Sequence, residues 1–232
     1  MKYKHILFDA DETLLDFSKA EAFALSEALK HEGVTCTDEV AQAYKTINKQ
    51  LWSEYEQGKI GQDKLRTERF ERLFRELDLA FGSGVGPFSK LYTQFLGKAS
   101  FLVEGAAPVC RDLIDSGLRL AIITNGIKEV QMSRIQGSEL AGCFEAIIVS
   151  EETGFHKPQR GIFDYAFDKL RLTDKTRVLM VGDSLSSDIR GGADYGIDTC
   201  WFNPLLQPNA SGVRPTYEIQ RLEQIRGLVV GA

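Results

Sequence analysis

Near the start of the chain lies the stretch HILFDAD (residues 5–11), a short apolar run that ends in two aspartates. Four further runs share this apolar character and its polar or small ending: LRLAIITNG (118–126), EAIIVSE (145–151), VLMVGDS (178–184) and IDTCWFN (197–203). Such runs are typical of strands that are buried on both faces. Helix-length patterns lie between them, including VCRDLIDSG (109–117) and GIFDYAFDKL (161–170). The alternation predicts an α/β fold with a parallel sheet wound by right-handed crossovers.

The stretch from about Asp16 to Ala99 does not continue this alternation. Its apolar residues recur at helical steps of three and four, as in Val40, Tyr44, Ile47, Leu51 and Tyr55. We interpret it as a small helical bundle inserted after the first strand. The run GSGVGP (82–87) has no strand before it and no Lys-Ser/Thr after it, so we interpret it as a loop between helices and not as a phosphate-binding loop.

The length of 232 residues corresponds to roughly one and a half domains of ~150 residues. The helical insertion accounts for the additional half domain. Because it lies after the first strand, it divides the sequence of the other domain into two parts. We therefore expect a catalytic core made of residues 1–15 and 100–232 and a helical domain over 16–99. With 43% hydrophobic and 26% charged residues, the chain has ordinary globular composition, which excludes disordered and fibrous classes.

The net charge and the cysteines indicate which classes of partner and which cellular compartment to expect. The chain has 28 basic and 33 acidic residues and a net charge of -5, which disfavours a nucleic acid partner. Its four cysteines are scattered singly, without the spacing of a zinc site, so we expect reduced thiols. No run approaches the ~18 apolar residues of a membrane span, and we see no signal peptide. We expect a cytoplasmic protein without a membrane partner, and the oligomeric state stays open.

Polar residues finish three of the predicted strands. Asp9 and Asp11 end the first strand, Thr124 lies near the end of the second, and Asp183 follows the apolar part of VLMVGDS. In an open parallel sheet, ligands bind at the carboxyl ends of the strands. These side chains are therefore the first candidates for a functional site.

The charges of these candidates indicate a metal ion. Asp9 and Asp11 would repel each other in a low-dielectric crevice unless a cation were present, and Asp183 and Asp188 add negative charge. Carboxylate oxygens without histidine or cysteine suit a hard ion, and Mg²⁺ fits best because it needs few protein ligands. Lys157, in the FHKPQ loop, is the natural positive counterweight.

Each candidate also has an ordinary interpretation. An aspartate such as Asp9 after a strand is usually a turn former or a helix cap. Thr124 and Asn125 before a glycine make a common turn, as does GDS (182–184), and Lys157 before a proline is typical of a solvated loop. The coincidence of all of them at strand ends favours the functional interpretation, a single site for phosphoryl transfer.

The set of segments that carries these residues resembles the four motifs of the haloacid dehalogenase superfamily of phosphohydrolases: DADETL (9–14), ITNG (123–126), HKP (156–158) and GDSLSSD (182–188). The resemblance implies a Rossmann-like core, and the helical insertion resembles the C1 cap domain of that superfamily. Three longer segments resemble bacterial house-cleaning 5'-nucleotidases that act on pyrimidine and noncanonical nucleoside monophosphates: NKQLWSEYEQGKI (48–60), SEETGFHKPQRGIFDYAF (150–167) and VLMVGDSLSSDIRGGADYGIDTCWFN (178–203).

The resemblance also implies catalytic roles. Asp9 would attack phosphorus and form an aspartyl-phosphate, and Asp11 would serve as general acid and then as general base. Thr124 and the Asn125 amide would hold the phosphoryl oxygens, while Lys157 would offset the charge that develops on them. Haloacid cleavage is disfavoured because dehalogenases of this fold lack the acid that Asp11 supplies.

The implied metal site holds Mg²⁺ between the Asp9 carboxylate, the Asp11 backbone carbonyl and Asp183. Asp188 would orient a metal-bound water or Lys157. One position departs from the pattern, because Glu12 stands where most relatives carry glycine. We interpret this as a position that does not need the conformational freedom of glycine.

Substrate choice is expected to come from the helical domain, since the core holds only the phosphoryl group of a small phosphorylated metabolite. Trp52 and Tyr55 lie three apart on one helical face near Asn48 and Lys49. They either pack within the bundle or form a lid that contacts a nucleobase. A sugar-phosphate or phosphoglycolate phosphatase is the alternative enzyme, and a receiver-like signalling module is the alternative of another class.

Overall fold

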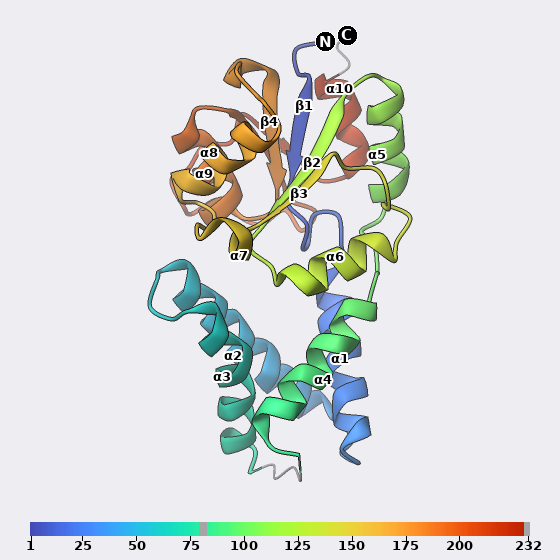
Figure 1. Ribbon diagram of the computed structural model, residues 1–232, viewed down its shortest axis with the longest axis vertical. Coiled ribbons are helices and arrows are strands. Elements are labelled where there is room, and N and C mark those ends of the chain that lie inside the picture. Colours follow the sequence, from blue (N-terminus) through green and yellow to red (C-terminus); the bar gives the residue numbers. More distant parts are fainter. Residues whose placement is uncertain (79–82, 230–232) are drawn as a thin grey trace. The chain divides into compact units, whose positions relative to one another are not determined.

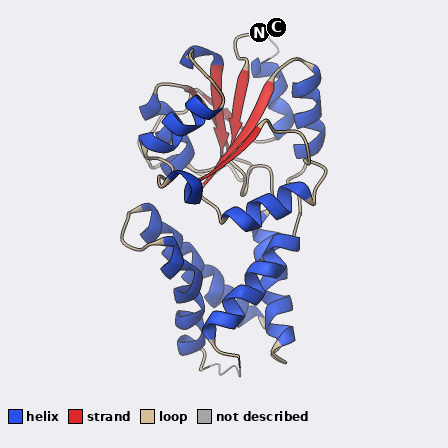
Figure 2. Cartoon of the chain, in the orientation of Figure 1, coloured by secondary structure: helices blue, strands red, loops and turns tan. Residues whose placement is uncertain are grey.

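The computed structural model describes residues 1–78 and 83–229. The chain divides into two compact units, one formed by Met1–Phe17 with Ser100–Ala232 and the other by Ser18–Ala99. The first unit contains the sheet, and the regular structure described in the second consists of helices (Figures 1 and 2). Within the described chain, no helix combines the length and the hydropathy that crossing a membrane requires.

The sheet has six parallel strands in the order β3-β2-β1-β4-β5-β6. Its strands are β1 (His5–Phe8), β2 (Arg119–Thr124), β3 (Ala146–Val149), β4 (Val178–Gly182), β5 (Asp198–Phe202) and β6 (Tyr217–Ile219). The predicted α/β fold with a parallel sheet is therefore confirmed. β6 was not predicted, because a strand of three residues is too short to show a periodic pattern.

Helices cover both faces of this sheet (Figure 1). The helices of this unit are α5 (Ala106–Asp115), α6 (Lys128–Gln136), α7 (Ser150–Thr153), α8 (Arg160–Lys169), α9 (Arg190–Tyr195) and α10 (Ile225–Val229), with short turns η1 (Lys175–Arg177), η2 (Leu185–Ile189) and η3 (Leu222–Gln224). Successive strand residues face opposite ways, so Ile6 and Phe8 pack with α5 and α10, while Leu7 packs with α8. This double burial explains the uninterrupted apolar runs in the sequence.

The helical unit contains α1 (Phe17–His31), α2 (Asp38–Glu56), α3 (Gln62–Glu76) and α4 (Val85–Lys98). Its interior is aromatic: the ring of Phe70 lies 5.6 Å from Tyr44, 5.0 Å from Phe88 and 5.1 Å from Tyr92, between centroids. The predicted helical bundle is thus confirmed. The GSGVGP run is loop only in part, since α4 begins at Val85, and its first residue lies outside the described residues. Pro87 fits there because the first turn of a helix needs no amide donor.

Candidate active site at the carboxyl ends of the strands

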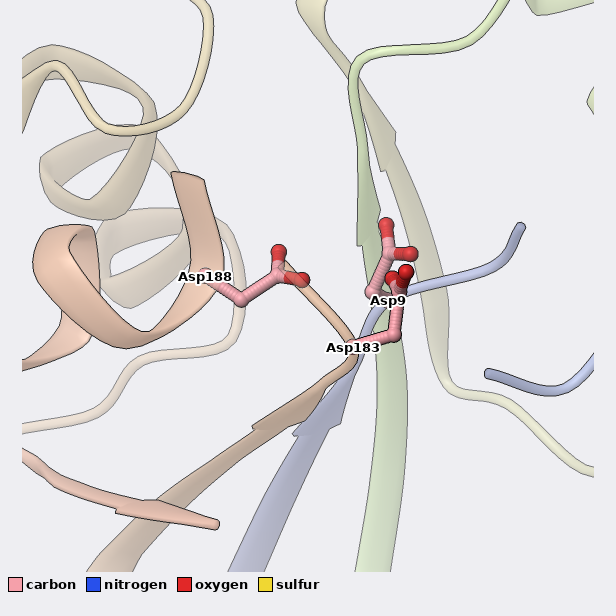
Figure 3. Close-up of side chains that lie close together, drawn as sticks. All are labelled: Asp9, Asp183 and Asp188. Carbon is pink, nitrogen blue, oxygen red and sulfur yellow. The ribbon is translucent and has the colours of Figure 1, made fainter. Parts of the chain in front are cut away.

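Three carboxylates meet where β1 and β4 end. Asp9 directly follows β1, Asp183 directly follows β4, and Asp188 lies in the π-helical turn η2. One oxygen of each lies within 4.8 Å of the others (Figure 3). Asp188 is fully buried and Asp9 is 8% exposed. The strands are parallel neighbours, so their carboxyl ends bring together residues that lie far apart in the sequence.

The backbone around β4 is shaped to hold these groups. A Cβ atom at Gly182 would lie 2.2 Å from Oδ2 of Asp188, so a side chain at that position would displace the carboxylate. The Ser184 amide donates a hydrogen bond to the same oxygen at 3.0 Å. The indole Nε1 of Trp201 donates to the Asp183 carbonyl at 2.8 Å. Trp201 was not predicted as a site residue, because this contact joins two strand ends 18 residues apart.

The side chain of Lys157 lies among these carboxylates. Its Nζ is 2.5 Å from Oδ1 of Asp9 and 2.7 Å from Oδ1 of Asp188, and the residue is only 1% exposed. Asn125 holds the lysine in place: its Nδ2 donates to the Lys157 carbonyl at 3.0 Å, and its Oδ1 accepts from the Lys157 amide at 2.7 Å. The Asn125 side chain therefore positions Lys157, a role that the sequence analysis did not predict.

The protonation of the site follows from burial and charge. Burial raises the pKa of Asp9 to about 7, with Lys157 opposing and Asp188 and Asp11 reinforcing the rise. Burial, together with Asp9 and Asp188, also raises the pKa of Asp183 well above its ordinary value. For Lys157, burial lowers the pKa, but the carboxylates of Asp188 and Asp9 outweigh burial and raise it. One lysine charge does not balance three carboxylates, and this oxygen-rich donor set fits a hard divalent cation such as Mg²⁺.

Asp11 lies apart from this cluster and points to other partners. Its carboxylate accepts hydrogen bonds from Arg134 Nη1 and Gln131 Nε2, both at 2.5 Å. A metal contact by Asp11 would therefore come from its backbone carbonyl, as the resemblance to the superfamily implies. Thr124 ends β2 nearby, is 1% exposed, and its hydroxyl accepts from the Gly126 amide at 3.1 Å. Gln131 and Arg134 were not predicted, because their only signal in the sequence is two polar residues three positions apart in a helix.

The interpretation of Glu12 was wrong. Its φ is 58°, so the backbone at this position lies in the left-handed region that favours glycine. A side chain there costs roughly 1–2 kcal/mol. The Glu12 amide donates to the Leu15 carbonyl at 2.8 Å, which holds the turn in this conformation. The position does use glycine-like geometry, and the glutamate adopts it under strain.

The candidate substrate residues of the helical unit all lie on α2. Asn48 is 2% exposed, and its amide donates to Glu21 Oε1 at 2.6 Å while its carbonyl accepts from Arg69 at 3.2 Å. Asn48 therefore joins helices inside the unit, which favours a packing role over a substrate contact. Lys49 is exposed, and Trp52 is half-buried with its ring 5.7 Å from that of Tyr55. These two residues remain candidates for substrate contact.

Mg²⁺ is expected to raise the thermal midpoint of the protein more at pH 8 than at pH 6. Below about pH 7 the Asp9 carboxyl holds a proton that a metal must displace, so binding weakens as the pH falls. Weaker binding gives less stabilisation of the folded state. Thermal unfolding with and without Mg²⁺ across this range, at constant ionic strength, measures the effect. A Mg²⁺-induced shift that does not change with pH would contradict it.

The comparisons with known proteins agree with this geometry. The model of the haloacid dehalogenase-like hydrolases matches residues 3–196. HAD-hydrolase YfnB of Bacillus subtilis is 38% identical over 97% of this chain and 94% of its own length, and its magnesium-bound crystal structure covers 99% of both chains with a TM-score of 0.91. Two pyrimidine 5'-nucleotidases are also similar: PynA of Streptococcus pneumoniae, 35% identical over 97% of this chain and 94% of its own, and YjjG of Escherichia coli, 34% identical over 99% of each. This chain belongs to the haloacid dehalogenase-like hydrolases.

Proposed function

We propose that the protein is a Mg²⁺-dependent phosphatase that hydrolyses nucleoside 5'-monophosphates, pyrimidine or noncanonical, through an aspartyl-phosphate. The observation that carries the proposal is the cluster of the Asp9, Asp183 and Asp188 carboxylates, in which Asp9 and Asp188 also pair with the Lys157 ammonium. An anionic nucleophile and an anionic phosphate can approach each other only where positive charge is concentrated. The two pyrimidine 5'-nucleotidases among the relatives support the substrate class.

The reaction proceeds in two displacements. In the first, a carboxylate oxygen of Asp9 forms a bond to phosphorus while the bond from phosphorus to the ester oxygen breaks, and Asp11 gives a proton to the departing alkoxide. In the second, Asp11 takes a proton from water, the water oxygen attacks phosphorus, and the bond to Asp9 breaks. Inorganic phosphate leaves, and both aspartates return to their starting state.

The remaining residues of the core bind charge and keep groups in place. Lys157 stabilises the negative charge on the transferring phosphoryl group, and Thr124 offers a hydroxyl to its oxygens. The Asn125 side chain keeps Lys157 in reach through its two hydrogen bonds to the Lys157 backbone. Asp9, the Asp11 carbonyl and Asp183, with Asp188 beside them, would hold Mg²⁺, which would supply additional positive charge against the phosphoryl oxygens.

The helical unit is the proposed source of selectivity. Lys49 and Trp52 offer a cation and an aromatic face on α2, which suit a phosphorylated nucleoside. In this proposal the catalytic core carries out the reaction and the helical unit recognises the nucleoside part of the substrate. The alternative is a sugar-phosphate or phosphoglycolate phosphatase, which would use the same core with a different preference in the helical unit.

A panel of phosphorylated metabolites tests the proposal. Phosphate release is measured with dUMP, dTMP and UMP, with hexose phosphates and phosphoglycolate, and with p-nitrophenyl phosphate, each with Mg²⁺ and with EDTA. We expect the highest kcat/KM for the pyrimidine nucleotides, loss of activity in EDTA, and its return when Mg²⁺ is added. A clear preference for hexose phosphates or phosphoglycolate would replace the nucleotidase assignment. A lasting stoichiometric phosphoprotein without repeated turnover would indicate a signalling module.

A further inference from the structure

We infer that Gln131 and Arg134 are positioning residues that fix the carboxylate of Asp11 for proton transfer. The inference rests on the proposed function, since it concerns the acid–base step of that reaction. Both residues lie on α6, three positions apart, and therefore on one face of that helix. Neither belongs to the four motifs that resemble the superfamily, so their role has to come from contacts.

The contacts occupy both oxygens of the carboxylate. Arg134 Nη1 donates to Oδ1 and Gln131 Nε2 donates to Oδ2, each at 2.5 Å. One donor on each oxygen fixes the rotation of the carboxylate about its bond to Cβ. The Asp11 side chain is 27% exposed, whereas the Arg134 side chain is fully buried and Gln131 is 1% exposed. The Asp11 carboxylate is thus held by two buried side chains, while it remains partly exposed to solvent.

The orientation of the Gln131 amide is determined by its surroundings. Its Nε2 also lies 3.3 Å from the Thr124 hydroxyl, and its Oε1 lies 3.5 Å from Arg134 Nη1. A reversed amide would set its oxygen against the Asp11 carboxylate and its nitrogen against the guanidinium, which is unfavourable on both sides. The amide therefore links the acid–base residue to the threonine that ends β2.

Gly126 and Phe17 lie against Gln131 and Arg134 and help to position them. A Cβ atom at Gly126 would lie 2.1 Å from Nε2 of Gln131, so glycine is needed there for the amide to reach Asp11. The guanidinium of Arg134 lies 5.8 Å from the centroid of the Phe17 ring, within cation–π range. Burying an arginine and a glutamine is costly without specific partners. Their convergence on one carboxylate is accounted for by a requirement on the orientation of that carboxylate.

The leaving group distinguishes a positioning role from a structural one. A poor leaving group, such as phenoxide or the alkoxide of a nucleotide, needs a proton as it departs, whereas p-nitrophenoxide departs readily as the anion. Loss of a correctly oriented Asp11 therefore slows phenyl phosphate and dUMP more than p-nitrophenyl phosphate. A substitution that only loosens the fold lowers kcat/KM for all three substrates by the same factor.

The experiment compares kcat/KM for phenyl phosphate, p-nitrophenyl phosphate and dUMP in the wild type, Gln131→Met, Arg134→Lys and Gly126→Ala. Gln136→Met is the matched control, since it makes the same change at an exposed position of α6. For Gln131→Met we expect a loss of about 10²-fold with phenyl phosphate and dUMP and a loss several-fold smaller with p-nitrophenyl phosphate. Gly126→Ala displaces the same amide sterically and should reproduce this pattern, and Gln136→Met should match the wild type.

Equal losses on phenyl and p-nitrophenyl phosphate in both Gln131→Met and Gly126→Ala would overturn the inference. Thermal unfolding of each variant identifies any variant that does not fold. If Gln131→Met does not fold, Gly126→Ala tests the role of Gln131 in its place, because Gly126→Ala leaves both buried polar side chains in the protein. Wild-type turnover tests the proposed function separately. If the wild type turns over none of the three substrates, the proposed function is overturned. If the wild type is active but the variants lose the same factor on every substrate, only the role of Gln131 and Arg134 is overturned.

Discussion

Asp9→Asn is expected to lose at least about 10⁴-fold of phosphatase turnover while the protein stays folded. The asparagine has nearly the volume of aspartate, but its amide is no anionic nucleophile and forms no aspartyl-phosphate. Because the pKa of Asp9 is raised to about 7, the charged carboxylate is disfavoured by its surroundings without metal. At pH 8, above that pKa, the substitution removes this penalty, so the metal-free variant should unfold no earlier than the metal-free wild type.

The measurement has two parts, steady-state phosphate release and thermal unfolding at pH 8 in EDTA. Asp194→Asn is the matched control, since it makes the same change at an exposed position of α9 and should leave both quantities unchanged. Trapping with radiolabelled phosphate ester should label the wild type transiently and Asp9→Asn not at all. Undiminished turnover in a folded Asp9→Asn protein would exclude Asp9 as the nucleophile.

Lys157→Met is expected to impair both catalysis and stability. In the proposed mechanism the lysine charge stabilises the transferring phosphoryl group, so its removal should lower kcat by about 10²–10³-fold. The same charge offsets two buried carboxylates, at 2.5 Å from Asp9 and 2.7 Å from Asp188. Leaving buried charges without their partner typically costs about 3–5 kcal/mol in the free energy of unfolding.

Mg²⁺ separates these two effects of Lys157→Met. A bound divalent cation also neutralises the carboxylates, so saturating Mg²⁺ should recover part of the lost stability. It should not recover kcat, because the ammonium that we propose to stabilise the phosphoryl group is still missing. Denaturant unfolding with and without Mg²⁺, beside phosphate release, measures both. Lys90→Met, an exposed position on α4, is the control. Stability equal to the wild type without metal would show that the lysine does not balance the cluster.

The residues that could be predicted from sequence share one property. Asp9, Thr124 and Asp183 each lie at or directly after the end of a strand, and the strands are visible as apolar runs because both of their faces are buried. The carboxyl ends of neighbouring parallel strands meet at one edge, so the order of the runs was sufficient to group these side chains. Lys157 was predicted only from its charge and its loop, and the structure brings it to Asp9 and Asp188.

The residues that could not be predicted act through contacts between distant segments. Gln131 and Arg134 reach Asp11 across 120 and 123 positions, and Trp201 reaches the Asp183 carbonyl from the next strand. The left-handed backbone of Glu12 was missed for a different reason: it is held by a local turn that closes on Leu15, and in the sequence alone a glutamate indicates that glycine geometry is not needed there. The contacts of Gln131, Arg134 and Trp201 have no local pattern, because hydrophobic periodicity reports which face is buried and not which polar groups meet.

The fold class, the helical insertion and the carboxylates at the strand ends could be predicted from the amino-acid sequence, because burial imposes a repeating pattern on the residues of every strand and helix. The packed structure was needed to show which carboxylates share Lys157, which one is held by Gln131 and Arg134, and that Asn48 lies inside the helical unit. Those assignments depend on distances of a few ångströms between groups far apart in the chain. Electrostatic and hydrogen-bond energies change steeply over such distances, so the partner of each charge is a property of the packed protein.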